Sequence, residues 1–305
     1  MCSDMNEVLR LESVSKKYGK KAALTDYSVS LKKGQVCGLT GHSGAGKTTV
    51  MNIISGLTSF DSGKLVFFSG KVSHRQARHR IGFVTERLMT DPAMTVFDNL
   101  EYMRFLRGVP EKKKTDELIS FAGLSEYSSV KVRKISYDMK KRLGFAMALT
   151  GDPEIVMLDG IFKGIDSECV SELKEMIRKL SEERKVSFII SSHKISELMD
   201  ICTDFSVLKN GEPAENVNID ELLTRCRKYI SIKTDDIDRT AAVIEEKMKI
   251  YDYQVINDEE LRIFSNTDDI RALSKAVTDS GIIITGLSCI SEPIDDHYQG
   301  EGDRL

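Results

Sequence analysis

Apolar and polar residues alternate in short stretches along the first part of the chain. Partial period-two alternation, with lysine-rich or glycine turns between the stretches, predicts strands. These stretches are residues 7–19, 23–35, 35–40, 62–71 and 79–86. Residues 47–57 instead have apolar positions at helical spacing, and they predict a helix that ends near Gly56.

The pattern becomes helical between residues 94 and 150 and then returns to alternating elements. Residues 95–108, 110–124 and 136–153 have helical spacing, which indicates a helical insertion. Strand and helix patterns then alternate, and such alternation implies a parallel sheet covered by helices. The predicted strands are 154–159, 185–193 and 204–212, and the predicted helices are 167–184 and 194–202.

The last third of the chain has a different order of elements. A short helix is predicted at 219–226, and a β-α-β-β-α-β series follows it. That order is typical of a small ferredoxin-like α+β domain. The series consists of residues 228–234, 237–249, 253–257, 260–266, 267–281 and 282–290, and the polar tail is expected to fray beyond Tyr298.

Composition narrows the class of protein. The 305 residues are 41% hydrophobic and 30% charged, an ordinary globular balance for one full domain and a smaller one. A net charge of −3 gives no sign of a nucleic-acid partner. The six cysteines are scattered without a CxxC pair, which favours reduced thiols over a zinc site or a disulfide framework. The sequence shows no signal peptide and no apolar run long enough to span a bilayer.

The stretch GHSGAGKTT lies between a predicted strand and a predicted helix and fits the pattern G-x4-G-K-[ST]. Glycines let successive backbone N–H groups converge on phosphates, and the helix N-terminus favours the same anions. Lys47 would supply a point charge, and Thr48 a hydroxyl for Mg²⁺. We therefore predict a nucleotide-binding α/β fold of the P-loop NTPase type. The predicted nucleotide-binding residues are Gly41, His42, Ser43, Gly44, Ala45, Gly46, Lys47, Thr48 and Thr49.

A second candidate for the metal site ends the apolar run of residues 155–158. Asp159 follows this predicted buried strand, downstream of the phosphate loop. A carboxylate at such a position is expected to join Thr48 in holding Mg²⁺. The next residue is Gly160, which carries no side chain.

These motifs, in this order, resemble the ATP-binding subunits of ABC transporters over residues 5–215. The match includes the Walker B strand before Asp159, the Q-loop with Glu86 instead of glutamine, and the signature region at 135–149. It also includes the D-loop at KGID and the H-loop at SSHKISELMDIC. The C-terminal unit is similar to that of bacitracin- and lantibiotic-type exporter subunits.

The resemblance implies roles for further residues. Tyr18 would lie against the adenine ring, and Ser136 would contact the γ-phosphate of a partner subunit's ATP. His193 would be the γ-phosphate switch, Asp166 would act from the D-loop, and Glu86 would act as a catalytic group or as a further metal ligand. The metal set implied in this way is Thr48, Asp159 and Glu86.

The chain departs from the family pattern on both faces of the expected dimer. The family has a glutamate, which polarises the attacking water, where this chain has Gly160. General-base catalysis is typically worth about 10²–10⁴-fold in rate, so hydrolysis is expected to be weak or absent. The signature has Tyr137 and Asp138 where two glycines are expected, which adds bulk and charge facing a phosphate. Rescue by Glu86, Asp166 or Glu168 is an alternative.

Several functions fit this combination. The first is the ATP-binding subunit of an exporter, paired with separate membrane-spanning permease chains and working as a homodimer or as a heterodimer with a second ATP-binding subunit. The alternatives are a nucleotide-sensing regulator without transport and an active ATPase with a non-standard acid. The first would lie at the cytoplasmic inner face of the membrane, and its permease would contact the insertion near residues 86–110.

The expected domains follow from these boundaries. Residues 1–215 form the ATP-binding domain, with a helical subdomain at about 87–150. Residues 216–227 form a linker helix, 228–298 a small regulatory or dimerisation domain, and 299–305 a tail. His297 and its neighbouring acids are expected to belong to a polar terminal helix instead of a metal site.

Overall fold

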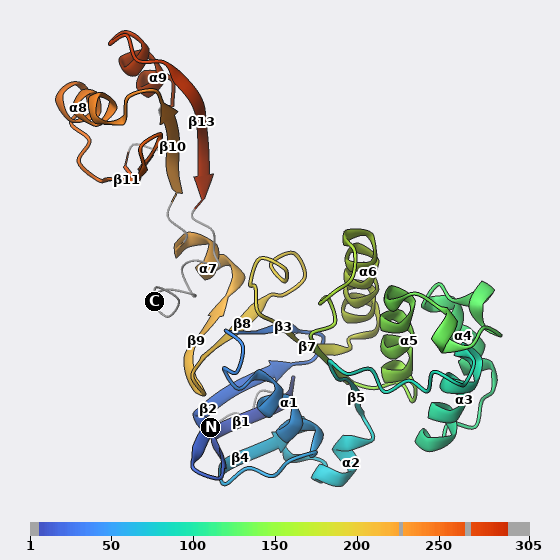
Figure 1. Cartoon of the computed structure of the whole chain (residues 1–305). Coiled ribbons are helices and arrows are strands. Elements are labelled where there is room, and N and C mark those ends of the chain that lie inside the picture. The colour runs from blue at the N-terminus through green and yellow to red at the C-terminus, as the bar shows by residue number, and fades with distance from the viewer. Residues whose placement is uncertain (1–5, 226–227, 266–269, 292–305) are drawn as a thin grey trace. The chain divides into compact units, whose positions relative to one another are not determined.

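The computed structural model describes residues 6–225, 228–265 and 270–291 and divides the chain into two compact units, Met1–Ile219 and Asp220–Leu305 (Figure 1). The border between the two units, after Ile219, lies within the linker helix expected at residues 216–227. Residues 216–218 complete a strand, and the helix α7 occupies Ile219–Arg225. The tail at 299–305 and His297 lie outside the described residues.

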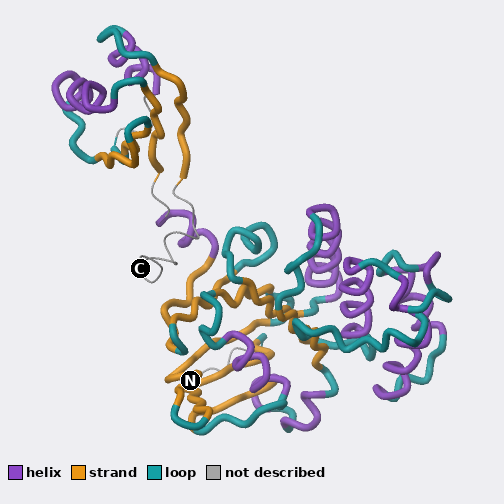
Figure 2. Tube along the Cα trace, in the orientation of Figure 1, coloured by secondary structure: helices purple, strands orange, loops and turns teal. Residues whose placement is uncertain are grey.

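A six-stranded sheet forms the middle of the first unit (Figures 1 and 2). Its strands are β3 (Val36–Thr40), β5 (Ile81–Val84), β6 (Ile155–Asp159), β7 (Ser187–Ser192), β8 (Asp204–Lys209) and β9 (Glu212–Asn218). The order is β5-β6-β7-β3-β8-β9, and all neighbours are parallel except the antiparallel pair β8 and β9. Every residue of β3, β6 and β7 is buried, as is typical of strands covered on both faces.

The same unit contains an antiparallel sheet of three strands. It consists of β1 (Glu7–Tyr18), β2 (Lys21–Lys32) and β4 (Ser62–Phe67) in the order β2-β1-β4. Helix α1 (Lys47–Ser55) shares one apolar core with both sheets. The buried hydroxyl of Tyr27 lies 2.8 Å from that of Ser206, and this hydrogen bond joins β2 to β8.

The predicted helical insertion contains three helices, which gather at the end of the unit away from the three-stranded sheet (Figure 1). They are α3 (Val96–Arg107), α4 (Lys113–Phe121) and α5 (Tyr137–Leu149). Helix α3 begins with a capping box in which Thr95 and Asp98 satisfy each other's backbone N–H groups. The other helices are α2 (His74–Arg78), α6 (Ser167–Arg184) and the 3₁₀ turns η1 (Phe68–Gly70), η2 (Ser125–Tyr127) and η3 (Val132–Lys134).

The second unit confirms the predicted β-α-β-β-α-β order. Its elements are β10 (Lys228–Thr234), α8 (Ile237–Met248), β11 (Tyr253–Asn257), β12 (Glu260–Ile263), α9 (Ile270–Thr278) and β13 (Ile284–Ser291). The antiparallel sheet has the order β11-β12-β10-β13. One face of it packs against α8 and α9 around a core of isoleucine, leucine and valine.

Helix α2 was not predicted, and residues 68–70 of the strand expected at 62–71 form the turn η1. Two further differences have a local cause. The helix expected at 194–202 is a series of turns. The Ser192 hydroxyl there donates to Glu197 and accepts from the N–H of Lys194, so local side-chain bonds replace helical ones. Strand β9 was not predicted, and it covers the exposed edge of β8.

Cysteine positions agree with the expected reduced thiols as far as the structure describes them. Cys37, Cys169 and Cys202 are buried and Cys289 is exposed, and none of these four forms a disulfide. Cys2 and Cys226 lie outside the described residues.

Candidate functional site

The phosphate loop connects β3 to α1, and its glycines have conformations that other residues rarely adopt. Gly44 and Gly46 have φ of 79° and 111°, and Gly41 has φ of 145°. A Cβ on Gly41 would lie 2.2 Å from the carbonyl oxygen of Leu208, and one on Gly46 would lie 2.7 Å from that of Ala23. Both positions therefore require glycine. The loop presents backbone N–H groups at the start of a helix, an arrangement that binds phosphate.

Lys47 is the most deeply buried cation of this loop, with 7% of its surface exposed. Its ammonium donates to the carbonyl oxygens of Gly41 (2.5 Å) and His42 (2.9 Å) and lies 3.2 Å from Nδ1 of His193. Burial lowers the pKa of Lys47 to about 8, although the carboxylates of Asp159 and Glu86 act in the opposite direction. The ammonium is therefore held at the phosphate end of the loop by partners that an anion can replace.

Thr48, Asp159 and Ser191 form a chain of hydrogen bonds next to this lysine. The Thr48 hydroxyl donates to Asp159 Oδ2 (2.9 Å), and the Ser191 hydroxyl donates to Asp159 Oδ1 (2.5 Å). Asp159 is 6% exposed. One hydroxyl and one carboxylate facing a phosphate loop suit Mg²⁺, which takes oxygen ligands and keeps several waters and phosphate oxygens. The described residues contain no group of three or more His, Cys, Asp or Glu that could hold a metal by themselves.

Gly160 follows Asp159 with φ of 60°. Its N–H donates to the Ser191 hydroxyl (2.9 Å), and its carbonyl oxygen accepts from the ammonium of Lys141 (2.8 Å). A Cβ built on Gly160 would lie 3.7 Å from Cγ of Glu86. The backbone of residue 160 is fully bonded, and the space beside it is already lined by the Glu86 side chain.

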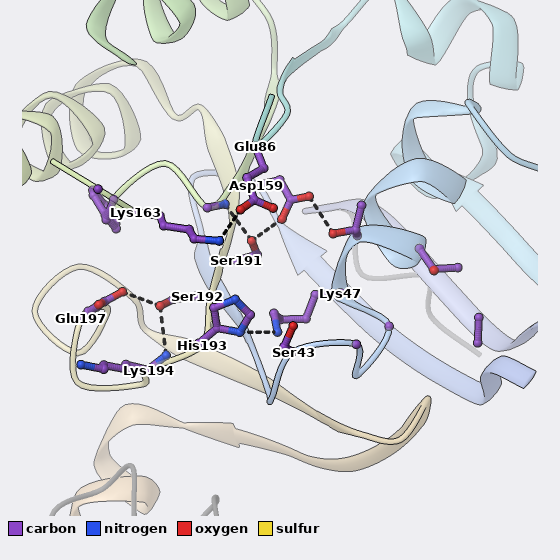
Figure 3. Close-up of a pocket in the computed structure, with 18 of the residues that line it drawn as sticks. Ser43, Lys47, Glu86, Asp159, Lys163, Ser191, Ser192, His193, Lys194 and Glu197 are labelled. Atoms are coloured by element: carbon purple, nitrogen blue, oxygen red, sulfur yellow. Dashed lines mark hydrogen bonds and ion pairs between the residues drawn. The ribbon is translucent and has the colours of Figure 1, made fainter. Parts of the chain in front are cut away.

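Glu86 is paired with Lys163. The distance between Lys163 Nζ and Glu86 Oε1 is 2.5 Å, and both side chains are more than half exposed (Figure 3). The hydrogen bond from Lys163 lowers the pKa of Glu86, and His193 and Lys141 lower it further. Glu86 is therefore a carboxylate with reduced basicity and with a direct cationic partner.

One cavity of about 660 Å³ is lined by Lys47, Thr48, Glu86, Asp159 and Lys163 together with their neighbours. Tyr18 lies at its rim with 49% of its surface exposed and with the Lys16 ammonium 5.5 Å from the ring centroid. His193 lies between Lys47 and the loop of Ser192, Lys194 and Glu197 (Figure 3). The predicted site residues that line the cavity are Tyr18, Ser43, Gly44, Gly46, Lys47, Thr48, Thr49, Glu86, Asp159 and His193.

Five other predicted positions are not among the residues that line the cavity. Gly41, His42 and Ala45 belong to the loop, and Nδ1 of His42 bonds to the carbonyl oxygen of Ser43 (2.8 Å). Asp166 caps α6 by accepting from the N–H of Cys169 (2.7 Å), and it does not line the cavity.

Ser136 also lies outside this cavity, at the start of the signature helix α5. Its hydroxyl accepts from the N–H of Met139 (3.2 Å) and caps the helix. Tyr137 is 47% exposed, and its ring lies 3.4 Å from the position of a Cβ on Gly164. Burial raises the pKa of Asp138, and the neighbouring carboxylate of Asp166 raises it further. The residues that replace the signature glycines therefore contact this chain's own D-loop.

Three residues of the site were missed in the sequence. Lys163, Lys141 and Ser191 bond to Glu86, Gly160 and Asp159. The signal for Ser191 was its place near the end of an apolar strand, two residues before His193. Lys141 is completely buried, although it belongs to a polar MKKR stretch that gives no sign of this.

Comparison with known proteins agrees with this geometry. The family described as ABC transporter matches residues 24–163. The bacitracin transport ATP-binding protein BcrA of Bacillus licheniformis is 28% identical over 296 residues, covering 96% of this chain and 97% of that protein. The lantibiotic transport ATP-binding protein SrtF of Streptococcus pyogenes is 31% identical over 205 residues, covering 67% of this chain and 88% of that protein.

A solved structure supports the fold. The dimeric post-hydrolysis state of the ATP-binding cassette MJ0796, bound to ADP and Pi, matches with a TM-score of 0.63 and 23% identity, covering 69% of this chain and 98% of that one. This match includes the P-loop NTPase architecture of the first unit. Together with the phosphate loop, the Thr48–Asp159 pair and His193, these relatives show that the chain belongs to the ATP-binding proteins of the ABC transporter family.

Proposed function

We propose that this chain is the ATP-binding subunit of an exporter and that ATP acts in it chiefly as a ligand that closes a dimer, with weak hydrolysis. The observation that carries the proposal is the contrast between two neighbouring residues. Asp159 is bonded to Thr48 beside an intact phosphate loop, whereas Gly160 has no side chain to polarise water. Binding groups are retained, and the expected general base is absent.

The relatives support the exporter part of this proposal. BcrA and SrtF are named for bacitracin and lantibiotic transport, and BcrA aligns with both units of this chain. Among the described residues, no helix has both the length and the apolar character to cross a bilayer. A separate permease would provide the membrane-spanning part, and the subunit would lie at the inner face of the membrane.

An apolar face on the helical insertion supports docking to such a permease. Tyr102, Phe105 and Leu106 on α3 are 54%, 67% and 63% exposed, and Met89 is 66% exposed. Large apolar side chains gathered in this way on a protein surface commonly mark a binding interface. The face belongs to the segment near residues 86–110.

The degenerate signature favours a second, different ATP-binding subunit as the dimer partner. In a head-to-tail dimer of identical chains, both sites would face Tyr137 and Asp138 and both would lack the acid at Gly160. An intact partner would instead give two half-damaged sites. One would hold this chain's phosphate loop without the acid at Gly160, and the other would keep the partner's general base but would face Tyr137 and Asp138. The ATP-binding cassette MJ0796 is dimeric in its solved structure, which supports a dimer of ATP-binding subunits.

The test measures ATP–Mg²⁺ binding and steady-state phosphate release on the purified chain. Binding is expected, with turnover about 10²–10⁴-fold below that of an active family member, because the general base is missing. Lys47→Ala should remove binding, because the phosphates lose their buried cation. Brisk phosphate release that Lys47→Ala abolishes would contradict the weak hydrolysis, and no binding by the unaltered protein would contradict the proposal as a whole.

A further inference from the structure

Lys163 is a second lysine at the phosphate end of the nucleotide cavity. It lies on the loop that follows Gly160, and its side chain lines the same cavity as Lys47, Thr48 and His193. Figure 3 shows the Lys163 ammonium directed toward the Glu86 carboxylate, which lies next to Asp159. The ammonium is therefore at a position that a bound phosphate group can approach.

The charges around Glu86 define this position more closely. The Glu86 carboxylate lines the same cavity as Lys47 and His193, and Lys47 Nζ lies 3.2 Å from Nδ1 of His193. Lys163 Nζ is 2.5 Å from this carboxylate and also interacts with the charge of Asp159. Lys47 and Asp159, which mark the expected phosphate and metal positions, line the same cavity as Lys163, so this lysine borders the space that a terminal phosphate would occupy.

The ion pair between Lys163 and Glu86 can be replaced at little cost by a pair between Lys163 and a phosphate. The two side chains are 62% and 56% exposed, and a pair of this exposure contributes little to stability. An arriving polyphosphate repels the Glu86 carboxylate and attracts the Lys163 ammonium. Gly160 adds no acid that could hold the lysine back.

We propose that Lys163 binds the terminal phosphate of ATP and that Glu86 holds this lysine when no nucleotide is bound. The inference rests on the proposed binding of ATP at the phosphate loop. ADP lacks the phosphate that Lys163 contacts, so Lys163 is a specificity-determining residue for ATP over ADP. Glu86 competes with the γ-phosphate for the same ammonium, and the two residues affect ATP affinity in opposite directions.

The experiment compares affinities for the non-hydrolysable β,γ-imido analogue of ATP and for ADP, by calorimetry on the full chain. Lys163→Met should weaken binding of the analogue about tenfold, the usual effect of one charge-assisted hydrogen bond, with ADP affinity unchanged. Glu86→Gln should strengthen binding of the analogue, because the lysine loses its competitor. Both side chains are largely exposed, so the variants are expected to fold, as circular dichroism would verify.

Lys113→Met is the matched control, since Lys113 also forms an exposed ion pair, 3.6 Å from Glu117, and does not line the nucleotide cavity. An equal loss in this control, or an unchanged affinity in Lys163→Met, would show that Lys163 forms only a surface ion pair. If Lys163→Met weakens the binding of ADP as much as that of the analogue, the lysine does not contact the terminal phosphate. Unaltered protein that binds neither nucleotide would contradict the proposed function itself.

Discussion

Lys47 illustrates how burial changes a single charged group of the site. Its surrounding carbonyl oxygens satisfy the ammonium, yet desolvation lowers its pKa from 10.5 to about 8. A lysine with a lowered folded-state pKa releases its proton more readily in the fold than in the unfolded chain. This residue's contribution to stability is therefore expected to increase as the pH increases from about 8 toward 10.5.

The same pKa predicts proton uptake when ATP binds. Phosphate oxygens near the ammonium favour its charged form and raise its pKa, so binding at pH 8 should take up part of a proton. Calorimetric titrations at pH 8 in two buffers with different ionisation enthalpies measure this uptake. Lys47→Arg is the control, because arginine stays charged at this pH. Equal binding enthalpies in both buffers for the unaltered protein would contradict the assignment.

A second prediction at the residue scale concerns Gly160 and the stability of the fold. Gly160→Ala should lower the free energy of unfolding by roughly 1–2 kcal/mol, because φ of 60° is unfavourable for a residue with a Cβ. Chemical denaturation measures the change. Gly19→Ala is a matched control, since Gly19 has φ of 59° and open space around its Cβ position. A clearly larger loss at Gly160 would mean that the bonds to Ser191 and Lys141 are also disturbed, and no loss would contradict the strain argument.

At the scale of elements, the sequence pattern predicted the structure correctly where residues close together in the chain determine it. The β3–loop–α1 unit was predicted because β3 is apolar, the loop is rich in glycine and the helix pattern ends at Gly56. The turns at 194–202 could not be predicted, because the apolar spacing there is also that of a helix and the bonds of Ser192 decide otherwise. The Lys163–Glu86 pair joins residues 77 apart in the sequence, so no local pattern signals it.

The exposed face of α3 makes a prediction at this scale. Phe105→Glu should reduce co-purification with the permease about tenfold or more, because a charge would be buried in an apolar interface. ATP affinity should be unchanged, since α3 does not line the nucleotide cavity. Tyr251→Glu, at a 68% exposed aromatic residue of the second unit, is the control. Equal loss in both variants, or none in Phe105→Glu, would exclude α3 as the docking element.

At the scale of the whole molecule, the two units have separate cores, and all residues that line the nucleotide cavity belong to the first. We therefore expect residues 1–225 to fold and to bind ATP with the affinity of the full chain. If the second unit mediates dimer contacts, the shortened chain should dimerise less with ATP, as measured by sedimentation. Unchanged dimerisation would assign the second unit another role, and lost ATP binding would contradict the independence of the units.

The buried Lys141 has a consequence for communication between two nucleotides. Its ammonium, on the signature helix α5, bonds to the carbonyl oxygen of Gly160 beside this chain's own phosphate loop. In the proposed head-to-tail dimer, the first turn of that helix faces the partner's ATP. Anything that moves the backbone at Gly160 would then shift the helix and change how the other ATP is held. Thermodynamic reciprocity requires that the second site acts back on the first with the same coupling free energy, so a site that hydrolyses poorly can still regulate its neighbour.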